Sequence, residues 1–214
     1  MNSPRVAEPP ALQVRDLRKQ FGRRHVLNGV DLDLPSGALV GVVGENGAGK
    51  STLLRILAGE LKPSGGSVRR SGSIGYCPQK SILNEALTID QHLRLFQAAY
   101  RLPTVTRALE LVERLNFAEY RRTPVRFLSG GTRQKLNLTL ALMHDPAVLL
   151  LDEPYQGFDW ETYLRFWEIA ADLHARDRTI VVISHLVHDR ERFDSVHHLK
   201  SGVIEQTSVE SEAS

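Results

Sequence analysis

The chain has 214 residues, a formal net charge of +2 and 42% hydrophobic residues, which suits one globular domain with a sizeable core. Lys plus Arg barely exceed Asp plus Glu and form no long basic run, so nucleic acid is not expected as a partner. The longest purely apolar run, 147–151, is far shorter than the roughly 20 residues of a membrane-spanning helix, so the chain is not expected to span a membrane. A single cysteine suits a reducing compartment.

Both ends of the chain are expected to be flexible. Residues 1–11 form a proline-interrupted arm and residues 206–214 form a polar tail, which leaves a single domain at 12–205. The domain opens with alternating apolar and polar residues between Leu12 and Leu34. This alternation predicts antiparallel strands, and therefore a small β layer ahead of the main core.

A phosphate-binding loop is predicted at GENGAGKST (44–52). A buried strand, ALVGVV, precedes it, and a helix that closes at Gly59 follows it. Backbone N–H groups of such a loop wrap the phosphates of a nucleotide, together with the N-terminus of the following helix. Lys50 supplies a positive charge between the β- and γ-phosphates, and the Ser51 hydroxyl can bind Mg²⁺. The predicted cofactor-binding residues of the loop are Gly44, Glu45, Asn46, Gly47, Ala48, Gly49, Lys50, Ser51 and Thr52.

A helical lobe is predicted between two strands of the core. The run SIGYCPQ (73–79) predicts a strand that ends at Gln79, and no strand is expected at 81–146. Helices are predicted in that segment by apolar residues at helical spacing and by helix start signals. They are a helix at 89–101 behind a capping box, a helix at 104–115, and a helix that follows Ser129. We therefore expect an inserted helical lobe at 81–146.

The core resumes after the lobe with two continuous apolar strands. AVLLLDEP (147–154) and TIVVISH (179–185) flank a helix at 160–176, and a hairpin at 196–206 follows. Continuous apolar strands that alternate with helices indicate a parallel sheet covered on both faces. The predicted fold class is therefore α/β, with a phosphate-loop NTPase core built on a parallel sheet.

Polar side chains at the strand ends should converge on the phosphate loop, because ligands bind beyond the carboxyl ends of strands in such a sheet. Asp152 can hold the water shell of Mg²⁺, and Glu153 can orient and polarise the attacking water. Gln79 offers an amide oxygen to Mg²⁺ or to that water. His185 can hydrogen-bond the γ-phosphate, although a histidine after a buried strand is usually structural, and a metal site with His188 is a weaker alternative.

A second anion-binding pattern, LSGGT (128–132), lies far from the phosphate loop in the sequence. Ser129 can bond an anion through its hydroxyl, while Gly130 and Gly131 let the backbone and the helix N-terminus approach closely. The residues alone do not say which phosphate this loop would bind.

Taken in order, these motifs resemble the nucleotide-binding domain of ABC (ATP-binding cassette) transporters, over about Leu12 to Glu205. The resemblance implies the ABC ATPase fold, ATP and Mg²⁺ as ligands, and ATP hydrolysis as the activity. It also implies an ATP-dependent head-to-tail dimer, in which the signature loop (128–132) and the D-loop (156–159) of one copy serve the nucleotide of the other. The residues implied to act across the dimer are Ser129, Gly130, Gly131 and Asp159.

The resemblance further implies a separate transmembrane permease subunit, which docks near residues 80–97 and holds the chain at the cytoplasmic face of the cell membrane. The compact length and the lack of a C-terminal regulatory domain resemble exporter-type cassettes. The alternative is a soluble ABC-type ATPase that acts in translation, repair or metal-cluster assembly. Such proteins usually carry two cassettes or a long coiled-coil insertion, and this sequence has neither.

Several positions depart from the family's usual residues. Phe21 stands where a tyrosine most often stacks on adenine, so stacking survives and a hydroxyl contact is lost. Thr132 replaces the usual glutamine of the signature loop. The D-loop, usually Ser-Ala-Leu-Asp, reads Gln-Gly-Phe-Asp here and keeps Asp159.

Other candidate residues are expected to be structural. An aromatic group falls near one face of the helix at 160–176, which indicates a packed core or a subunit contact rather than a ligand site. Its members are Trp160, Tyr163 and Trp167. Cys77 is expected to be a buried apolar residue rather than a reactive thiol. His197 and His198 point to opposite faces of a strand and cannot chelate a metal together.

Overall fold

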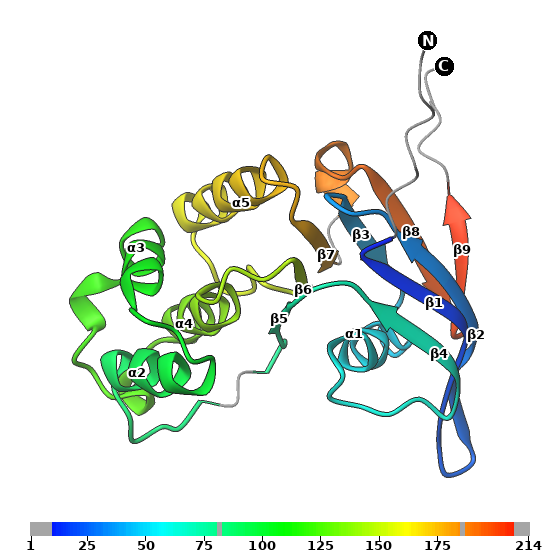
Figure 1. Ribbon diagram of the computed structural model, residues 1–214, viewed down its shortest axis with the longest axis horizontal. Helices are drawn as coiled ribbons and strands as arrows, with labels where there is room; N and C mark the ends of the chain where they lie inside the picture. The colour runs from blue at the N-terminus through cyan, green and yellow to red at the C-terminus, as the bar shows by residue number, and fades with distance from the viewer. Residues whose placement is uncertain (1–9, 81–82, 185–186, 208–214) are drawn as a thin grey trace.

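The computed structural model describes residues 10–80, 83–184 and 187–207 (Figure 1). The strands are β1 (Leu12–Phe21), β2 (Arg24–Leu34), β3 (Leu39–Val43), β4 (Gly65–Arg70), β5 (Ile74–Cys77), β6 (Val148–Asp152), β7 (Thr179–Ile183), β8 (Ser195–Lys200) and β9 (Val203–Thr207). The α-helices are α1 (Lys50–Ala58), α2 (Ile89–Ala99), α3 (Thr106–Arg114), α4 (Gly130–Leu142) and α5 (Trp160–His174). Short 3-10 helices are η1 (Ala118–Tyr120), η2 (Val125–Phe127) and η3 (Val187–Arg192).

The strands form two sheets. One is antiparallel with the order β2-β1-β4, and the other has the order β5-β6-β7-β3-β8-β9. All neighbours in the second sheet are parallel except β9, which pairs antiparallel with β8. Figure 1 shows the helical lobe of α2, α3 and α4, in green, on the opposite side of the molecule from the antiparallel layer. The predicted fold class is confirmed, including the β layer and the inserted lobe.

The parallel sheet is buried on both faces, and each face has its own hydrophobic core. On β6, Leu149 and Leu151 belong to the core under the helices of the lobe and α5, whereas Val148 and Leu150 belong to the core under α1 and the antiparallel sheet. Both sets are almost fully buried. This double burial is the physical reason why the central strands read as continuous apolar runs.

A few elements differ from the sequence prediction. β4 has no predicted counterpart, because GGSVRR is polar and lies at the edge of the antiparallel sheet. β5 ends at Cys77, so Gln79 follows the strand in a loop instead of ending it. Near the chain ends, Ala11 is buried and β9 continues to Thr207. The folded domain therefore includes residues that the sequence assigns to the arm and the tail.

The first helix of the lobe, α2, begins at the predicted capping box. Thr88 Oγ1 accepts a hydrogen bond from the backbone N–H of Gln91, and the Gln91 side chain accepts one from the N–H of Thr88. These reciprocal bonds satisfy N–H groups that the first turn of a helix leaves without partners. Among the residues described, no strand lies at 83–146, and no helix is both long and apolar enough to span a membrane.

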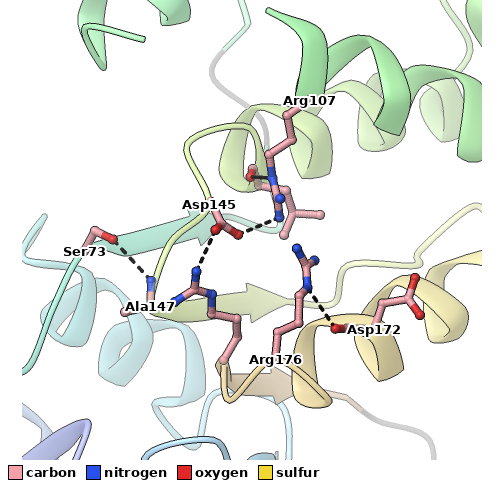
Figure 2. A network of polar contacts seen from close by, with 8 residues as sticks. Ser73, Arg107, Asp145, Ala147, Asp172 and Arg176 are labelled. Carbon is pink, nitrogen blue, oxygen red and sulfur yellow. Dashed lines mark hydrogen bonds and ion pairs between the residues drawn. The ribbon is translucent and has the colours of Figure 1, made fainter. Parts of the chain in front are cut away.

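An ion-pair network fixes the amino-terminal edge of the parallel sheet (Figure 2). Asp145, just before β6, pairs with Arg107 of α3 at 2.8 Å and with Arg178, just before β7, at 2.6 Å. Arg107 also donates through Nε to the carbonyl of Leu142 at the end of α4. Burial lowers the pKa of Arg107, and the Asp145 carboxylate opposes that shift. One carboxylate therefore joins the lobe to two neighbouring strands.

We expect Asp145→Asn to destabilise the domain, because it leaves the partly buried Arg107 and Arg178 without a shared counter-charge. Asparagine keeps the volume and tolerates the left-handed backbone of this position, φ 52°. For a partly exposed network the loss should be about 1–2 kcal/mol, and a thermal unfolding curve should show Tm lower by about 3–6 °C. The matched control is Asp33→Asn, which removes an exposed ion pair with Arg15 and should leave Tm almost unchanged. Equal Tm values for the two variants would contradict a structural role of the network.

Candidate functional site

The phosphate loop lies between β3 and α1, and its backbone conformation requires glycine. Gly44, Gly47 and Gly49 all have positive φ angles, of 155°, 82° and 107°. A Cβ atom on Gly44 would lie 2.2 Å from the Leu199 carbonyl oxygen, and one on Gly49 would lie 3.0 Å from the Val26 carbonyl oxygen. At these two glycines the loop backbone therefore lies directly against β8 and β2, with no room for a side chain. It leads directly into the N-terminus of α1, where N–H groups favour an anion.

Lys50 is a buried cation at the base of this loop. Its Nζ donates to the carbonyls of Gly44 at 2.7 Å and Glu45 at 3.0 Å. Burial lowers the pKa of Lys50, and the negative charges of Glu153 and Asp152 oppose that shift. Two backbone carbonyls thus orient an ammonium group whose burial makes a negatively charged ligand favourable.

The acidic pair lies at the carboxyl end of β6. Asp152 is the last residue of the strand and is buried. Glu153 follows with a left-handed backbone, φ 50°, and its N–H donates to the Ile183 carbonyl at 3.1 Å. Its Oε2 accepts a 3.0 Å hydrogen bond from Gln79 Nε2. The loop after β5 therefore brings Gln79 to Glu153, although Gln79 is not part of the strand.

Lys50, Gln79 and Glu153 share with much of the phosphate loop one pocket of about 390 Å³, a volume within the usual range for a small-molecule site. The lining residues are Phe21, Arg24, Val26, Asn46, Gly47, Gly49, Lys50, Ser51, Thr52, Gln79 and Glu153. Gly44, Glu45 and Ala48 line a neighbouring groove with the residues of the β8–β9 hairpin. Most of the predicted cofactor-binding residues thus come together in space.

Arg24 and Val26 line the pocket without having been predicted. A Cβ atom on Gly47 would lie 3.9 Å from Arg24 Nη2, so the guanidinium group reaches the phosphate loop. The one signal in the sequence is that Arg24 lies close behind Phe21, at the turn between β1 and β2. Phe21 is 47% exposed, and Lys19 Nζ lies 4.9 Å from its ring centroid. A cation therefore covers one face of the ring.

The residues suggested for Mg²⁺ have suitable chemistry. Ser51 and Gln79 line the pocket, and Asp152 is buried at the end of the adjacent strand. A hydroxyl, an amide oxygen and a carboxylate are the hard oxygen ligands that Mg²⁺ prefers. The donor set present in the chain fits the cation.

The signature loop and the D-loop do not line this pocket. Ser129 begins α4 as its N-cap, and its Oγ accepts from the Thr132 N–H at 3.1 Å and lies 2.9 Å from Thr132 Oγ1. Asp159 begins α5 in the same way and accepts from the Thr162 N–H at 2.7 Å. That backbone bond is the main reason why the pKa of Asp159 is lowered. Both loops therefore end in capped helix N-termini.

The predicted histidine His185 lies outside the described residues, and so does the side chain of His188, so their roles remain predictions. His197 is buried on β8, and burial lowers its pKa. Within the described ranges, no cluster of three His, Cys, Asp or Glu side chains suits a metal ion.

The aromatic group of α5 divides into a buried part and an exposed part. Trp167 is 4% exposed and packs in the core between Phe166 and Phe193. Trp160 is 72% exposed and stacks on Tyr163 with ring centroids 5.3 Å apart. The predicted core contact therefore holds for Trp167, whereas Trp160 lies on the surface beside the D-loop.

Comparisons with known proteins give one family. Residues 27–156, more than half of the chain, match the model of the ABC transporter family. Nod factor export ATP-binding protein I of Ralstonia nicotianae is 33% identical over 204 residues, which span 88% of this chain and 64% of that protein. A solved structure described as the ATP binding subunit of an ABC transporter superposes with a TM-score of 0.87 at 26% identity, covering 93% of this chain and 90% of that chain.

A dimeric bacterial ABC transporter cassette superposes with a TM-score of 0.85 at 24% identity, covering 94% of this chain and 99% of that chain. At that identity the likeness shows a common fold. The chain spans less than two thirds of the length of the Nod factor export protein.

We expect Cys77 to stay unreactive in the folded protein. Its side chain is fully buried, burial raises the pKa of the thiol, and Asn137 Nδ2 lies 3.3 Å from the sulfur. Because the thiolate is the reactive species, an aromatic disulfide reagent should label Cys77 only at the rate of global unfolding. The matched control is the same measurement in denaturing urea, where labelling should be complete within the mixing time. Fast labelling of the native protein would contradict this packing.

Proposed function

This chain belongs to the ABC transporter family, and from that premise we propose that it binds and hydrolyses MgATP to drive transport through a separate membrane subunit. The observation that carries the proposal is one pocket that holds a glycine-rich loop, a buried lysine and a carboxylate oriented by a glutamine. These are the parts that phosphoryl transfer to water requires, because its catalysis depends on positioning and charge.

The triphosphate would be bound by the phosphate loop. N–H groups of the loop and the N-terminus of α1 bind the α- and β-phosphates, and Lys50 Nζ exchanges its carbonyl partners for phosphate oxygens. Arg24 reaches over the loop from the β1–β2 turn and adds a second positive charge. The face of Phe21 not covered by Lys19 is available for stacking on the adenine ring.

Hydrolysis would use the pair of Gln79 and Glu153. Glu153 holds the attacking water and withdraws its proton as the water oxygen bonds to the γ-phosphorus and the bond from that phosphorus to the bridging oxygen breaks, which releases ADP and phosphate. Gln79 fixes the carboxylate through the 3.0 Å bond to Oε2. Ser51 and Asp152, with Gln79 nearby, would hold Mg²⁺, which would compensate the charge of the phosphate oxygens when bound. In this proposal His185 contacts the γ-phosphate.

A second copy of the chain would complete the site. Ser129, Gly130, Gly131 and Asp159 lie outside the pocket of their own chain, which is consistent with a role at the nucleotide of a partner. A solved cassette of the same fold is dimeric, which supports pairing of two copies. Binding of ATP would close the pair, and hydrolysis would release it.

The membrane subunit would dock beside the lobe. A groove of about 240 Å³ lies between the core and the lobe, and Leu83, Phe96 and Tyr100 contribute to its apolar wall. Leu95, on the neighbouring surface of α2, is 53% exposed. Leu83 and Phe96 belong to the predicted docking segment, 80–97, and in this proposal the groove would receive a short apolar stretch of the permease. We therefore place the chain at the cytoplasmic face of a membrane, and the name of the Nod factor export relative supports export as the direction.

We expect Glu153→Gln to bind MgATP but to hydrolyse it about 10²- to 10⁴-fold more slowly, which is the usual contribution of a general base. The amide keeps the shape and can still accept the bond from Gln79, so only the charge is lost. The measurement is steady-state phosphate release together with the size of the protein in MgATP, where a closed dimer should accumulate. The control Glu168→Gln changes an exposed carboxylate of α5 and should turn over normally. Normal turnover by Glu153→Gln would remove this residue from the role of base.

We expect Lys50→Ala to weaken MgATP binding about 10- to 100-fold, because it removes a buried charge-assisted hydrogen bond to the phosphates. Binding can be measured by titration of a fluorescent ATP analogue into the monomer. Lys62→Ala is the matched control, since it removes an exposed lysine in the loop before β4. An unchanged affinity of Lys50→Ala would contradict the assignment of the phosphate loop.

A further inference from the structure

Two glycines from distant parts of the chain meet beside the proposed dimer surface. Gly131 is in the first turn of α4, and Gly157 is in the D-loop between β6 and α5. A Cβ atom on Gly131 would lie 2.5 Å from the carbonyl oxygen of Gly157, so the two backbones touch where a side chain would stand. On the adjacent Gly130, a Cβ atom would have no neighbour within 4 Å. The two glycines of the signature loop therefore differ in what surrounds them.

Gly157 is required for a different reason from Gly131. Its φ angle is 81°, in the left-handed region that residues with a side chain rarely adopt. A Cβ atom on Gly157 would itself make only ordinary contacts, 3.7 Å from Gly131 N. The backbone turn at Gly157 directs its carbonyl at Gly131, and the missing side chain of Gly131 admits that carbonyl.

Two further interactions hold the D-loop against the helical part of the chain, one through packing and one through the attraction of opposite charges. Phe158 packs against the large core under the helices. Asp159 and Lys135 of α4 attract each other: the carboxylate opposes the lowering of the Lys135 pKa by burial, and the lysine contributes to the lowered pKa of Asp159. The D-loop is therefore tied to α4 before and after Phe158.

We propose that Gly131 and Gly157 are a positioning pair that joins the signature loop and the D-loop of the same chain into one rigid edge. This inference rests on the proposed function: in the dimer, the glycine pair makes the signature loop and the D-loop reach the second copy together. Glycine at 157, where the resemblance leads one to expect alanine, supplies the left-handed turn that the contact needs. Gly131 then serves its own chain as well as the nucleotide of a partner.

The direction of the change in Tm caused by alanine at two neighbouring positions, 130 and 131, tests the contact in the isolated chain. Alanine normally stabilises a helix relative to glycine, so Gly130→Ala should raise Tm slightly or leave it unchanged. Gly131→Ala should lower Tm by about 3 °C, because its methyl group displaces the Gly157 carbonyl. Amide hydrogen exchange at 156–159 should become about tenfold faster in Gly131→Ala and stay unchanged in Gly130→Ala. Equal exchange in the two variants overturns the proposal.

Substitutions at Gly157 separate the turn from the side chain. Gly157→Asn should keep exchange at 156–159 near the wild-type rate, because asparagine tolerates a left-handed backbone. Gly157→Ala should raise that rate about fivefold. If both variants exchange at the same rate, the left-handed turn is not what positions the D-loop.

A third experiment tests the role of the pair in dimerisation. It adds MgATP to Glu153→Gln protein with and without a second substitution at Gly157. Gly157→Ala should leave binding of MgATP to the monomer unchanged and weaken the ATP-bound dimer about tenfold, measured by analytical ultracentrifugation. If Gly157→Ala loses MgATP binding and dimerisation together, the variant is generally unfolded and the positioning role is overturned. An unchanged dimer affinity also overturns that role. If the background protein does not dimerise at all, the proposed function fails, while the exchange data still decide whether the glycine pair exists.

Discussion

The contact of Gly44 with the carbonyl of Leu199 holds the phosphate loop in place, and the rest of the site is arranged around it. With a side chain at Gly44 the loop could not lie against β8. Gly49 makes a second close approach, to Val26 of β2. The loop is thus fixed between the parallel sheet and the antiparallel layer. Because the loop is fixed, its Gly44 and Glu45 carbonyls can hold the Lys50 ammonium group in the pocket.

The two edges of the parallel sheet have different tasks. At the amino-terminal edge, Asp145 pairs with two arginines and joins the lobe to the core. At the carboxyl-terminal edge, the charged and polar groups of the pocket converge, with Glu153 in a left-handed backbone conformation. Such strained backbone is stable only where its surroundings fix it, and here the bond from Glu153 N–H to Ile183 does so. The same sheet therefore carries a charge network at one edge and a strained backbone beside the pocket at the other.

Much of this arrangement could be predicted. The central strands are buried on both faces and are therefore continuous apolar runs in the sequence, and the residues of the phosphate loop have a fixed spacing. β4 could not be predicted, since an exposed edge strand has no apolar pattern to distinguish it from a loop. Arg24 was missed because its place in the pocket depends on how the β1–β2 turn folds over the loop. The contact of Gln79 with Glu153 depends on a loop path after β5, which spacing along the chain does not specify.

The hydrogen bonding of Ser129 bears on the threonine that follows the two signature glycines. A serine hydroxyl has two lone pairs and one proton. If Thr132 donates in the 2.9 Å contact, Ser129 accepts from both the N–H and the hydroxyl of Thr132 and keeps its own proton for a phosphate oxygen. Under the proposed function, Thr132 would then orient Ser129 within its own chain before a second copy arrives. Glutamine, the usual residue of the signature loop in the family that the sequence resembles, has no hydroxyl, so under the proposed function Thr132 would give up reach across the dimer and gain local orientation of Ser129.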